Sequence, residues 1–165
     1  MPRQSYTALQ TLNLNLQQQV QKLSNDPAYG ILTRPAIDFE LARIHDAARS
    51  VVFMDVDGLH ELNAVHGYEG MNGRIKRAVH VRAADVMLRA RWWSGDEIIF
   101  VLAEGDPFAF CHRLKSACKS EGFTATFCHS PYSGDLAHTV HACAAMVQRA
   151  KLDGRRDTIT ALVGG

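Results

Sequence analysis

Residues 86–102 read VMLRARWWSGDEIIFVL, two apolar runs on either side of the short polar segment Ser94–Glu97. Runs rich in branched and aromatic residues, separated by a few polar residues that include glycine, are typical of an antiparallel β-hairpin. The tip of this hairpin carries two adjacent carboxylates, Asp96 and Glu97. The stretch therefore predicts two paired strands with acidic side chains at the turn between them.

A second acidic turn follows the most apolar strand of the chain. Val51–Met54 is a short continuous apolar run, which predicts a buried central strand, and Asp55 and Asp57 come directly after it. Carboxylates close together at the end of a buried strand repel each other. A bound Mg²⁺ ion, which prefers hard oxygen ligands, removes that repulsion. Asp also commonly caps a following helix, so the spacing alone leaves a metal site and a helix cap both open.

The rest of the chain alternates between helical and strand-like patterns. Predicted helices cover residues 4–24, 35–48, 70–84, 106–120 and 136–152, and predicted strands cover 51–54, 86–93, 98–102, 123–128 and 158–163. This order predicts an α+β fold, a mixed and largely antiparallel five-stranded sheet packed with helices. We divide the chain into an N-terminal helix at residues 1–24 and one globular domain at residues 25–165.

The N-terminal helix has a narrow apolar seam. Leu9, Leu12, Leu16 and Leu23 stand at heptad-like intervals, with Val20 beside them. Such a seam is typical of a helix that forms a short coiled coil with a second chain or docks on a partner. Because it is only about two heptads long, packing of the helix on its own domain is an equally open alternative.

Composition excludes several classes of protein. A net charge of +1 over 165 residues argues against a strongly basic protein that wraps a nucleic acid polymer. No apolar run approaches the roughly 18 residues of a membrane span, and the N-terminus lacks the apolar core of a secretion signal. We therefore expect a cytoplasmic protein without a membrane partner, whose four cysteines, none in a C-x-x-C pair, are buried free thiols.

Four stretches together resemble the GGDEF nucleotide cyclases. Residues 94–98 (SGDEI) resemble the GGDEF signature, and residues 26–34 (DPAYGILTR) resemble the opening D-P-L-T-G-L-x-N-R motif. Residues 54–68 (MDVDGLHELNAVHGY) resemble D-x-D-x-F-K-x-x-N-D-x-x-G-H, and residues 150–155 (AKLDGR) are similar to the closing A-K-x-x-G-R motif. The four occur in the family's order and span nearly the whole folded part of the chain.

The resemblance implies a palm-like, ferredoxin-like cyclase domain with a metal centre. Asp55 and Asp96 would hold two Mg²⁺ (or Mn²⁺) ions, with help from the carbonyl of Val56, and Glu97 would complete the metal shell or help deprotonate the attacking hydroxyl. The catalytic residues implied are therefore Asp55, Asp96 and Glu97.

The resemblance also implies a set of nucleotide contacts. Backbone amides of the turn at Gly58 and Leu59 would face the phosphates, and Asn63 would contact the base. Lys151 and Arg155, one helical turn apart at i and i+4, would share a face and hold the triphosphate tail. The full set implied is Gly58, Leu59, His60, Asn63, Asn72, Lys151 and Arg155.

Three positions depart from the family pattern. Ser94 replaces the first signature glycine, His60 replaces a lysine, and Asn72 stands where the family has the aspartate that reads guanine. A carboxylate only accepts hydrogen bonds, whereas an amide both donates and accepts and so also suits the edge of adenine. We therefore expect ATP, GTP or both as substrates and an adenine-containing product.

The expected function is that of a nucleotidyl cyclase, which condenses nucleoside triphosphates into a cyclic (di)nucleotide signal. A single palm binds one triphosphate, so we expect a homodimer that brings two nucleotides together. Diguanylate cyclases and the CRISPR-type polymerases, whose minimal stand-alone forms act in phage defence, share this palm, and the sequence leaves both open. The alternative is a catalytically inactive GGDEF-like module that binds a nucleotide or a protein partner.

Overall fold

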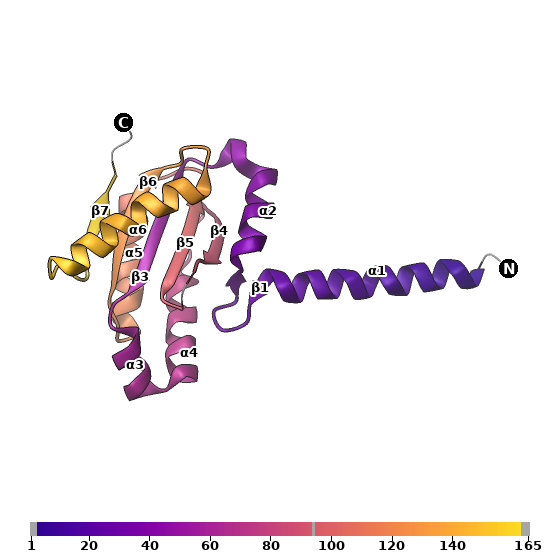
Figure 1. Cartoon of the computed structure of the whole chain (residues 1–165), viewed down its shortest axis with the longest axis horizontal. Helices are drawn as coiled ribbons and strands as arrows, with labels where there is room; N and C mark the ends of the chain where they lie inside the picture. The colour runs from indigo at the N-terminus through magenta and orange to yellow at the C-terminus, as the bar shows by residue number, and fades with distance from the viewer. Residues whose placement is uncertain (1–2, 94, 163–165) are drawn as a thin grey trace.

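The computed structural model of the chain describes residues 3–93 and 95–162, with side chains for all of these except 3–7 and 21. One sheet runs through the domain with helices on both of its faces (Figure 1). The strands are β1 (Asn25–Asp26), β2 (Ile31–Leu32), β3 (Ser50–Val56), β4 (Val86–Arg91), β5 (Glu97–Leu102), β6 (Ala125–Pro131) and β7 (Ile159–Ala161). The helices are α1 (Arg3–Ser24), α2 (Arg34–Ile44), α3 (Leu59–His66), α4 (Tyr68–Val79), α5 (Pro107–Ser120) and α6 (Leu136–Leu152), with a 3₁₀ turn at His45–Ala47.

The strand order is β1-β2-β4-β5-β3-β6-β7. β3 is antiparallel to both of its neighbours, β5 and β6, and six of its seven residues are buried, which confirms the predicted central strand. The predicted hairpin is confirmed as the antiparallel pair β4–β5. Because only β2–β4 and β6–β7 are parallel among the described strand pairs, the sheet is mixed and largely antiparallel, as expected.

The predicted number of five strands is wrong, because the sheet has seven. The two strands that the sequence pattern missed, β1 and β2, have two residues each, too few to show any alternation of apolar and polar residues. Gly30 has a φ of +65° in the turn between them, a conformation that glycine adopts without steric cost. This turn brings β1 back alongside β2 in an antiparallel pair.

Several predicted element boundaries also need correction. The helix predicted at 70–84 is α4, which ends at Val79, and the short helix α3 before it, none of whose residues is buried, was missed. The helix predicted at 35–48 ends at Ile44. The last strand ends at Ala161, and both Val163, to which it was predicted to extend, and Ser94 lie outside the described residues.

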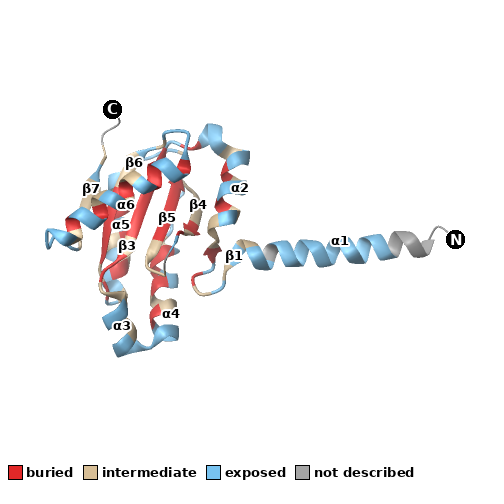
Figure 2. Ribbon diagram, viewed as in Figure 1, coloured by how far each residue is buried: buried red, intermediate tan, exposed pale blue. Residues whose placement is uncertain are grey.

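Two apolar layers hold the domain together. Alternate residues of β3 point to opposite faces, so Val52 and Met54 pack with α4 and α5 while Val51 and Phe53 pack with α2 and α6. Figure 2 shows the buried residues along the strands and along the inner sides of the helices that cover them. All four cysteines are free and buried in these layers, as predicted.

Helix α1 projects away from the rest of the domain (Figure 1). Its seam faces solvent: Leu9, Leu12, Leu16, Val20 and Leu23 are each more than half exposed. The seam therefore does not pack on the domain of its own chain. No helix in the described part of the chain is long and apolar enough to cross a membrane.

Candidate active site

The two acidic turns meet at one end of the central strands. Asp55 lies directly opposite Glu97 in the register of β3 and β5. The backbone N–H of Val56 donates to the carbonyl of Asp96 at 3.0 Å, which holds the hairpin tip against the end of β3. The structure therefore brings together the predicted catalytic residues Asp55, Asp96 and Glu97.

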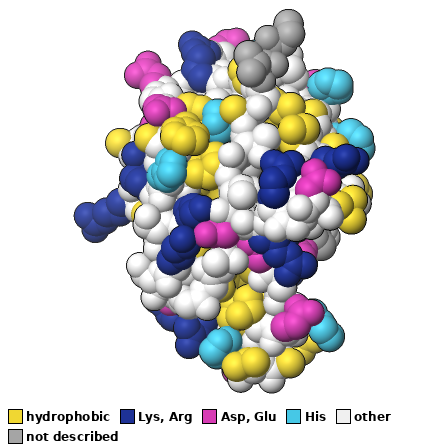
Figure 3. Space-filling view, turned by 90° about the vertical axis from the view of Figure 1, so that its left-hand side faces the viewer, with side chains coloured by type: hydrophobic (Ala, Val, Ile, Leu, Met, Phe, Trp, Pro, Cys, Tyr) yellow, Lys and Arg dark blue, Asp and Glu magenta, His cyan; other side chains and the backbone are white. Residues whose placement is uncertain are grey.

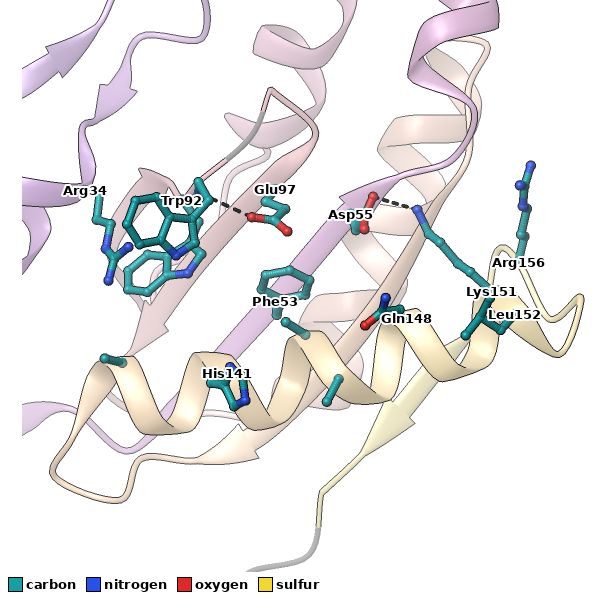
Figure 4. A pocket seen from close by; sticks show the side chains of 14 residues that line it. Arg34, Phe53, Asp55, Trp92, Glu97, His141, Gln148, Lys151, Leu152 and Arg156 are labelled. Atoms are coloured by element: carbon teal, nitrogen blue, oxygen red, sulfur yellow. Dashed lines mark hydrogen bonds and ion pairs between the residues drawn. The ribbon is translucent and has the colours of Figure 1, made fainter.

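Lys151 completes this group from helix α6. Its ammonium nitrogen lies 2.6 Å from Oδ1 of Asp55 (Figure 4) and donates to the carbonyl of Val56 at 3.2 Å. The side chain of Lys151 is 20% exposed and that of Asp55 19%, so water weakens this ion pair only in part.

The environment of Asp55 favours the protonated form of its carboxyl. Burial raises the pKa of Asp55 from 3.8 to about 6; the hydrogen bond and charge of Lys151 oppose that shift, and the charges of Asp96 and Glu97 add to it. Asp55 and Glu97 lie on facing strands and Asp96 adjoins Glu97, so three carboxylates lie within electrostatic reach of one another.

Asp57 has a structural role in this turn. It is 7% exposed and accepts hydrogen bonds from the hydroxyls of Thr126 at 2.8 Å and Thr124 at 2.9 Å and from the backbone N–H of Asp157 at 3.1 Å. The ammonium nitrogen of Lys151 lies 3.2 Å from Oδ1 of Asp57, the oxygen that also accepts from Thr126. These bonds tie the end of β3 to β6 and to the segment after α6.

The helix-cap interpretation of the acidic turn is wrong. The N-cap of α3 is Gly58, and no side chain caps that end of the helix. Gly58 has a φ of +64°, which suits glycine and turns the chain sharply between β3 and α3. Leu59 and His60 follow as the first residues of α3.

The two predicted base contacts lie on the pair of helices behind the turn. Asn63 is on α3, and its side-chain oxygen Oδ1 is buried without a hydrogen-bond partner. Asn72 is on α4 and half-buried. A buried amide oxygen without a donor is costly, so a ligand that donates to it would be stabilised there.

Arg155 does not share a helical face with Lys151, contrary to the prediction. Helix α6 ends at Leu152, and Gly154 adopts a φ of +73° immediately after it. This is the usual glycine-terminated helix end, and it redirects the chain before Arg155. Arg155 is exposed and pairs with Asp153 at 3.2 Å.

A cavity of about 820 Å³ opens beside the carboxylates, between α6 and the β4–β5 hairpin (Figure 4). Sequence reasoning identified three of its lining residues, Asp55, Glu97 and Lys151, and missed the others. The missed residues are Arg34, Phe53, Trp92, Trp93, Ala137, His141, Ala144, Ala145, Gln148, Leu152 and Arg156. The signal was present on α6, where the lining residues recur at three- and four-residue intervals.

One face of the molecule carries a mixed charge pattern. Figure 3 shows acidic side chains lying among Lys and Arg side chains on the face it presents, with no extended region of one sign. Among the described residues, no three His, Cys, Asp or Glu side chains are grouped as a metal site. The predicted donor set is different in kind, because it combines two carboxylates with the backbone carbonyl of Val56.

Comparison with solved structures shows which fold this is. The chain is similar to the coiled coil and GGDEF domain of DgcB from Caulobacter crescentus in complex with c-di-GMP, with a TM-score of 0.76 at 18% identity over 97% of this chain and 96% of that one. It is also similar to the diguanylate cyclase SiaD from Pseudomonas aeruginosa, in complex with its activator SiaC, with a TM-score of 0.65 at 18% identity over 97% of this chain and 70% of that one.

A third similar structure is the S helix-GGDEF-EAL portion of Vibrio cholerae LapD, with a TM-score of 0.69 at 14% identity over 93% of this chain and 41% of that one. No family model matches the sequence, and no curated protein matches it. The chain therefore has the fold of GGDEF diguanylate cyclase domains, as the sequence motifs indicated.

Proposed function

We propose that this protein is a metal-dependent nucleotidyl cyclase that joins nucleoside triphosphates into a cyclic dinucleotide. One observation carries the proposal: Asp55, the carbonyl of Val56 and the hairpin tip with Asp96 and Glu97 meet at the end of the central strands. The GGDEF fold supports the same activity, since diguanylate cyclases are among the similar structures.

The donor set fits a hard divalent cation. The ammonium of Lys151 contacts both Oδ1 of Asp55 and the carbonyl oxygen of Val56, so these two oxygens already converge on one positive charge. Carboxylate and carbonyl oxygens are the ligands that Mg²⁺ takes in phosphate-handling sites. Asp55, Val56 and Asp96 would hold Mg²⁺ or Mn²⁺, which would supply positive charge to the triphosphate.

The chain's own residues would perform the remaining tasks. In the joining step the 3′-oxygen of one nucleotide bonds to the α-phosphorus of another, the bond from that phosphorus to pyrophosphate breaks, and Glu97 accepts the hydroxyl proton. Lys151 would hold the phosphates together with the amides at Gly58 and Leu59 and the side chain of His60. Asn63 would accept a hydrogen bond from the base through its unpartnered oxygen.

We further propose that the substrates include ATP and that the active form is a homodimer. Asn72 supports the first point because its amide suits adenine as well as guanine. The exposed seam of α1 supports the second, because a leucine stripe that faces solvent is stabilised by pairing with the same stripe of a second copy.

The direct test mixes the purified protein with labelled ATP, GTP or both and Mg²⁺, and resolves the products by mass. We expect a cyclic dinucleotide that contains adenine, and none from Asp55→Ala or Asp96→Ala. Asp46→Ala is the matched control, since the Asp46 side chain is 95% exposed and lies outside the site. Full activity in Asp55→Ala would refute the assignment.

A second candidate function is an inactive module that binds a nucleotide. The position of Lys151 favours it, because the ammonium occupies the oxygens that a metal would need. The two candidates differ in one result: the inactive module would bind a triphosphate without forming a cyclic product at any Mg²⁺ or Mn²⁺ concentration.

A further inference from the structure

The cavity beside the carboxylates lies apart from the predicted base contacts. It is lined by α2, the β4–β5 hairpin, β3 and α6, and neither Asn63 on α3 nor Asn72 on α4 lines it. Its volume of about 820 Å³ falls within the range of small-molecule sites. It therefore has room for a ligand that the predicted nucleotide contacts do not account for.

One end of the cavity is aromatic and carries an unsatisfied donor. The guanidinium of Arg34 lies 4.2 Å from the ring centre of Trp92 and 3.7 Å from that of Trp93. Its Nη1 is buried and has no hydrogen-bond acceptor, so an acceptor on a bound ligand would relieve the cost of its desolvation. Trp93 is 76% exposed, a large apolar surface left uncovered at the mouth of the cavity.

The opposite end of the cavity carries Arg156 (Figure 4). Arg156 is exposed and forms no ion pair with any residue that the structure describes. Asp55 and Glu97 lie between the two ends. A ligand that fits this layout has a flat heterocycle at one end and an anionic group at the other, which is the chemistry of a nucleotide.

We propose that this cavity binds a guanine nucleotide, with the base against Trp93 and Arg34 and the phosphate at Arg156. Every nucleobase can stack on an exposed aromatic side chain, so Trp93 contributes affinity without discriminating between bases. Arg34 makes the choice: a guanidinium only donates, and guanine presents two acceptors, O6 and N7, on one edge. Adenine presents a donor beside its N7 on that edge, which opposes a donor of Arg34.

Binding in this cavity does not depend on the proposed function, but the role of the ligand does. Asp55 and Glu97 line the cavity, so a nucleotide held there lies beside the proposed catalytic carboxylates. It would then be a reactant or product of the cyclase reaction, in addition to the triphosphate that Asn63 and Asn72 would hold.

Tryptophan fluorescence tests the proposal directly, because the chain has two tryptophans and both line the cavity. The full-length protein is titrated with GMP, AMP and ribose 5-phosphate, none of which has a pyrophosphate group to release. We expect saturable quenching by GMP, binding of AMP that is at least about tenfold weaker, and weaker binding still of ribose 5-phosphate.

Arg34→Lys keeps the charge but removes the fork of donors, and should reduce the preference for GMP over AMP by about tenfold. Arg43→Lys, on the exposed side of the same helix, should leave that preference unchanged. Trp93→Ala, at an exposed position that folding does not need, should weaken GMP and AMP alike. Retained thermal unfolding transitions would show that all three variants are folded.

Several outcomes would overturn the proposal: no saturable quenching by GMP, equal binding of GMP and AMP, equal binding of ribose 5-phosphate, or an unchanged preference in Arg34→Lys. If the proposed cyclase function is wrong, the experiments give a different result from any of these. In that case GMP quenches as expected but no cyclic product forms from triphosphates. Product formation without quenching by GMP would leave the proposed function standing and reject only this site.

Discussion

The ammonium nitrogen of Lys151 lies 2.6 Å from Oδ1 of Asp55, although 96 positions separate the two residues in the sequence. The contact ties the C-terminal part of α6 to the end of β3 and supplies one positive charge to a site with three carboxylates. Lys151 also touches Asp57 at 3.2 Å, so loss of Asp55 alone would leave the ammonium with a partner.

The first prediction concerns catalysis by the acidic turns. Asp55→Ala and Asp96→Ala should each lower the rate of product formation by at least about a hundredfold, as loss of one transition-state electrostatic contact typically does. The fold should persist, because the remaining carboxylate Asp57 still pairs with Lys151. Product yield by mass, with circular dichroism as the folding control, checks both parts.

A second prediction follows from the raised pKa of Asp55. The pKa is about 6 in the folded protein against 3.8 for a free side chain, so between these values the folded state binds more protons than the unfolded state. The contribution of Asp55 to stability is therefore complete below about pH 4 and is lost as pH rises through about 6. The expected loss is on the order of 3 kcal/mol.

The measurement compares the free energy of unfolding of wild type and Asp55→Asn by urea titration in a metal-free buffer. The amide does not titrate, so the wild type should lose stability relative to the variant across that pH window. A difference between the two proteins that does not change with pH would show that the pKa of Asp55 is not raised by folding.

The third prediction concerns the base. Asn72→Asp should shift the preference towards GTP, because a carboxylate gains a charge-assisted hydrogen bond from guanine worth roughly 1.5–3 kcal/mol. That corresponds to a change of about tenfold to a hundredfold in the ratio of the two kcat/KM values. Competition between ATP and GTP checks this. Strict use of GTP by the wild type, unaltered in the variant, would show that Asn72 does not read the base.

The fourth prediction concerns the exposed seam of α1. Leu12→Glu/Leu16→Glu should shift the protein towards monomer and lower its specific activity at low concentration, because like charges would then face each other across a paired helix. Gln10→Glu/Gln18→Glu adds the same charge away from the seam and should change neither. Sedimentation velocity gives the oligomeric state, and an active monomeric wild type would contradict the homodimer.

The fifth prediction concerns the ion pair between Asp26 in β1 and Arg91 in β4, whose nitrogen and oxygen lie 2.7 Å apart. It joins the segment after α1 to the hairpin that carries Asp96. A double-mutant cycle with Asp26→Asn and Arg91→Gln should give a coupling energy of about 1–2 kcal/mol, since the pair is partly buried. The exposed pair Glu40–Arg43 is the control and should give about 0.3–0.5 kcal/mol. Equal coupling energies for the two ion pairs would show that the Asp26–Arg91 pair stabilises the fold no more than an exposed pair does.

The sequence by itself predicted five of the seven strands and the chemistry of the turns. Val51–Met54 is apolar throughout and became the buried central strand, and the polar tip between two β-rich runs became the β4–β5 hairpin. Both signals are local, because strand propensity and turn chemistry depend on neighbouring residues. The resemblance of four ordered motifs to the GGDEF cyclases likewise indicated the fold that structural comparison then showed.

Only the tertiary structure decided which distant elements pair and which side chains meet. The two-residue strands β1 and β2 form because β2 pairs with the edge of β4 and β1 in turn pairs with β2. The stacking of Arg34 on Trp92 and Trp93 joins a helix start to a hairpin more than fifty residues away. Such contacts depend on packing between elements, which periodicity along the chain does not encode.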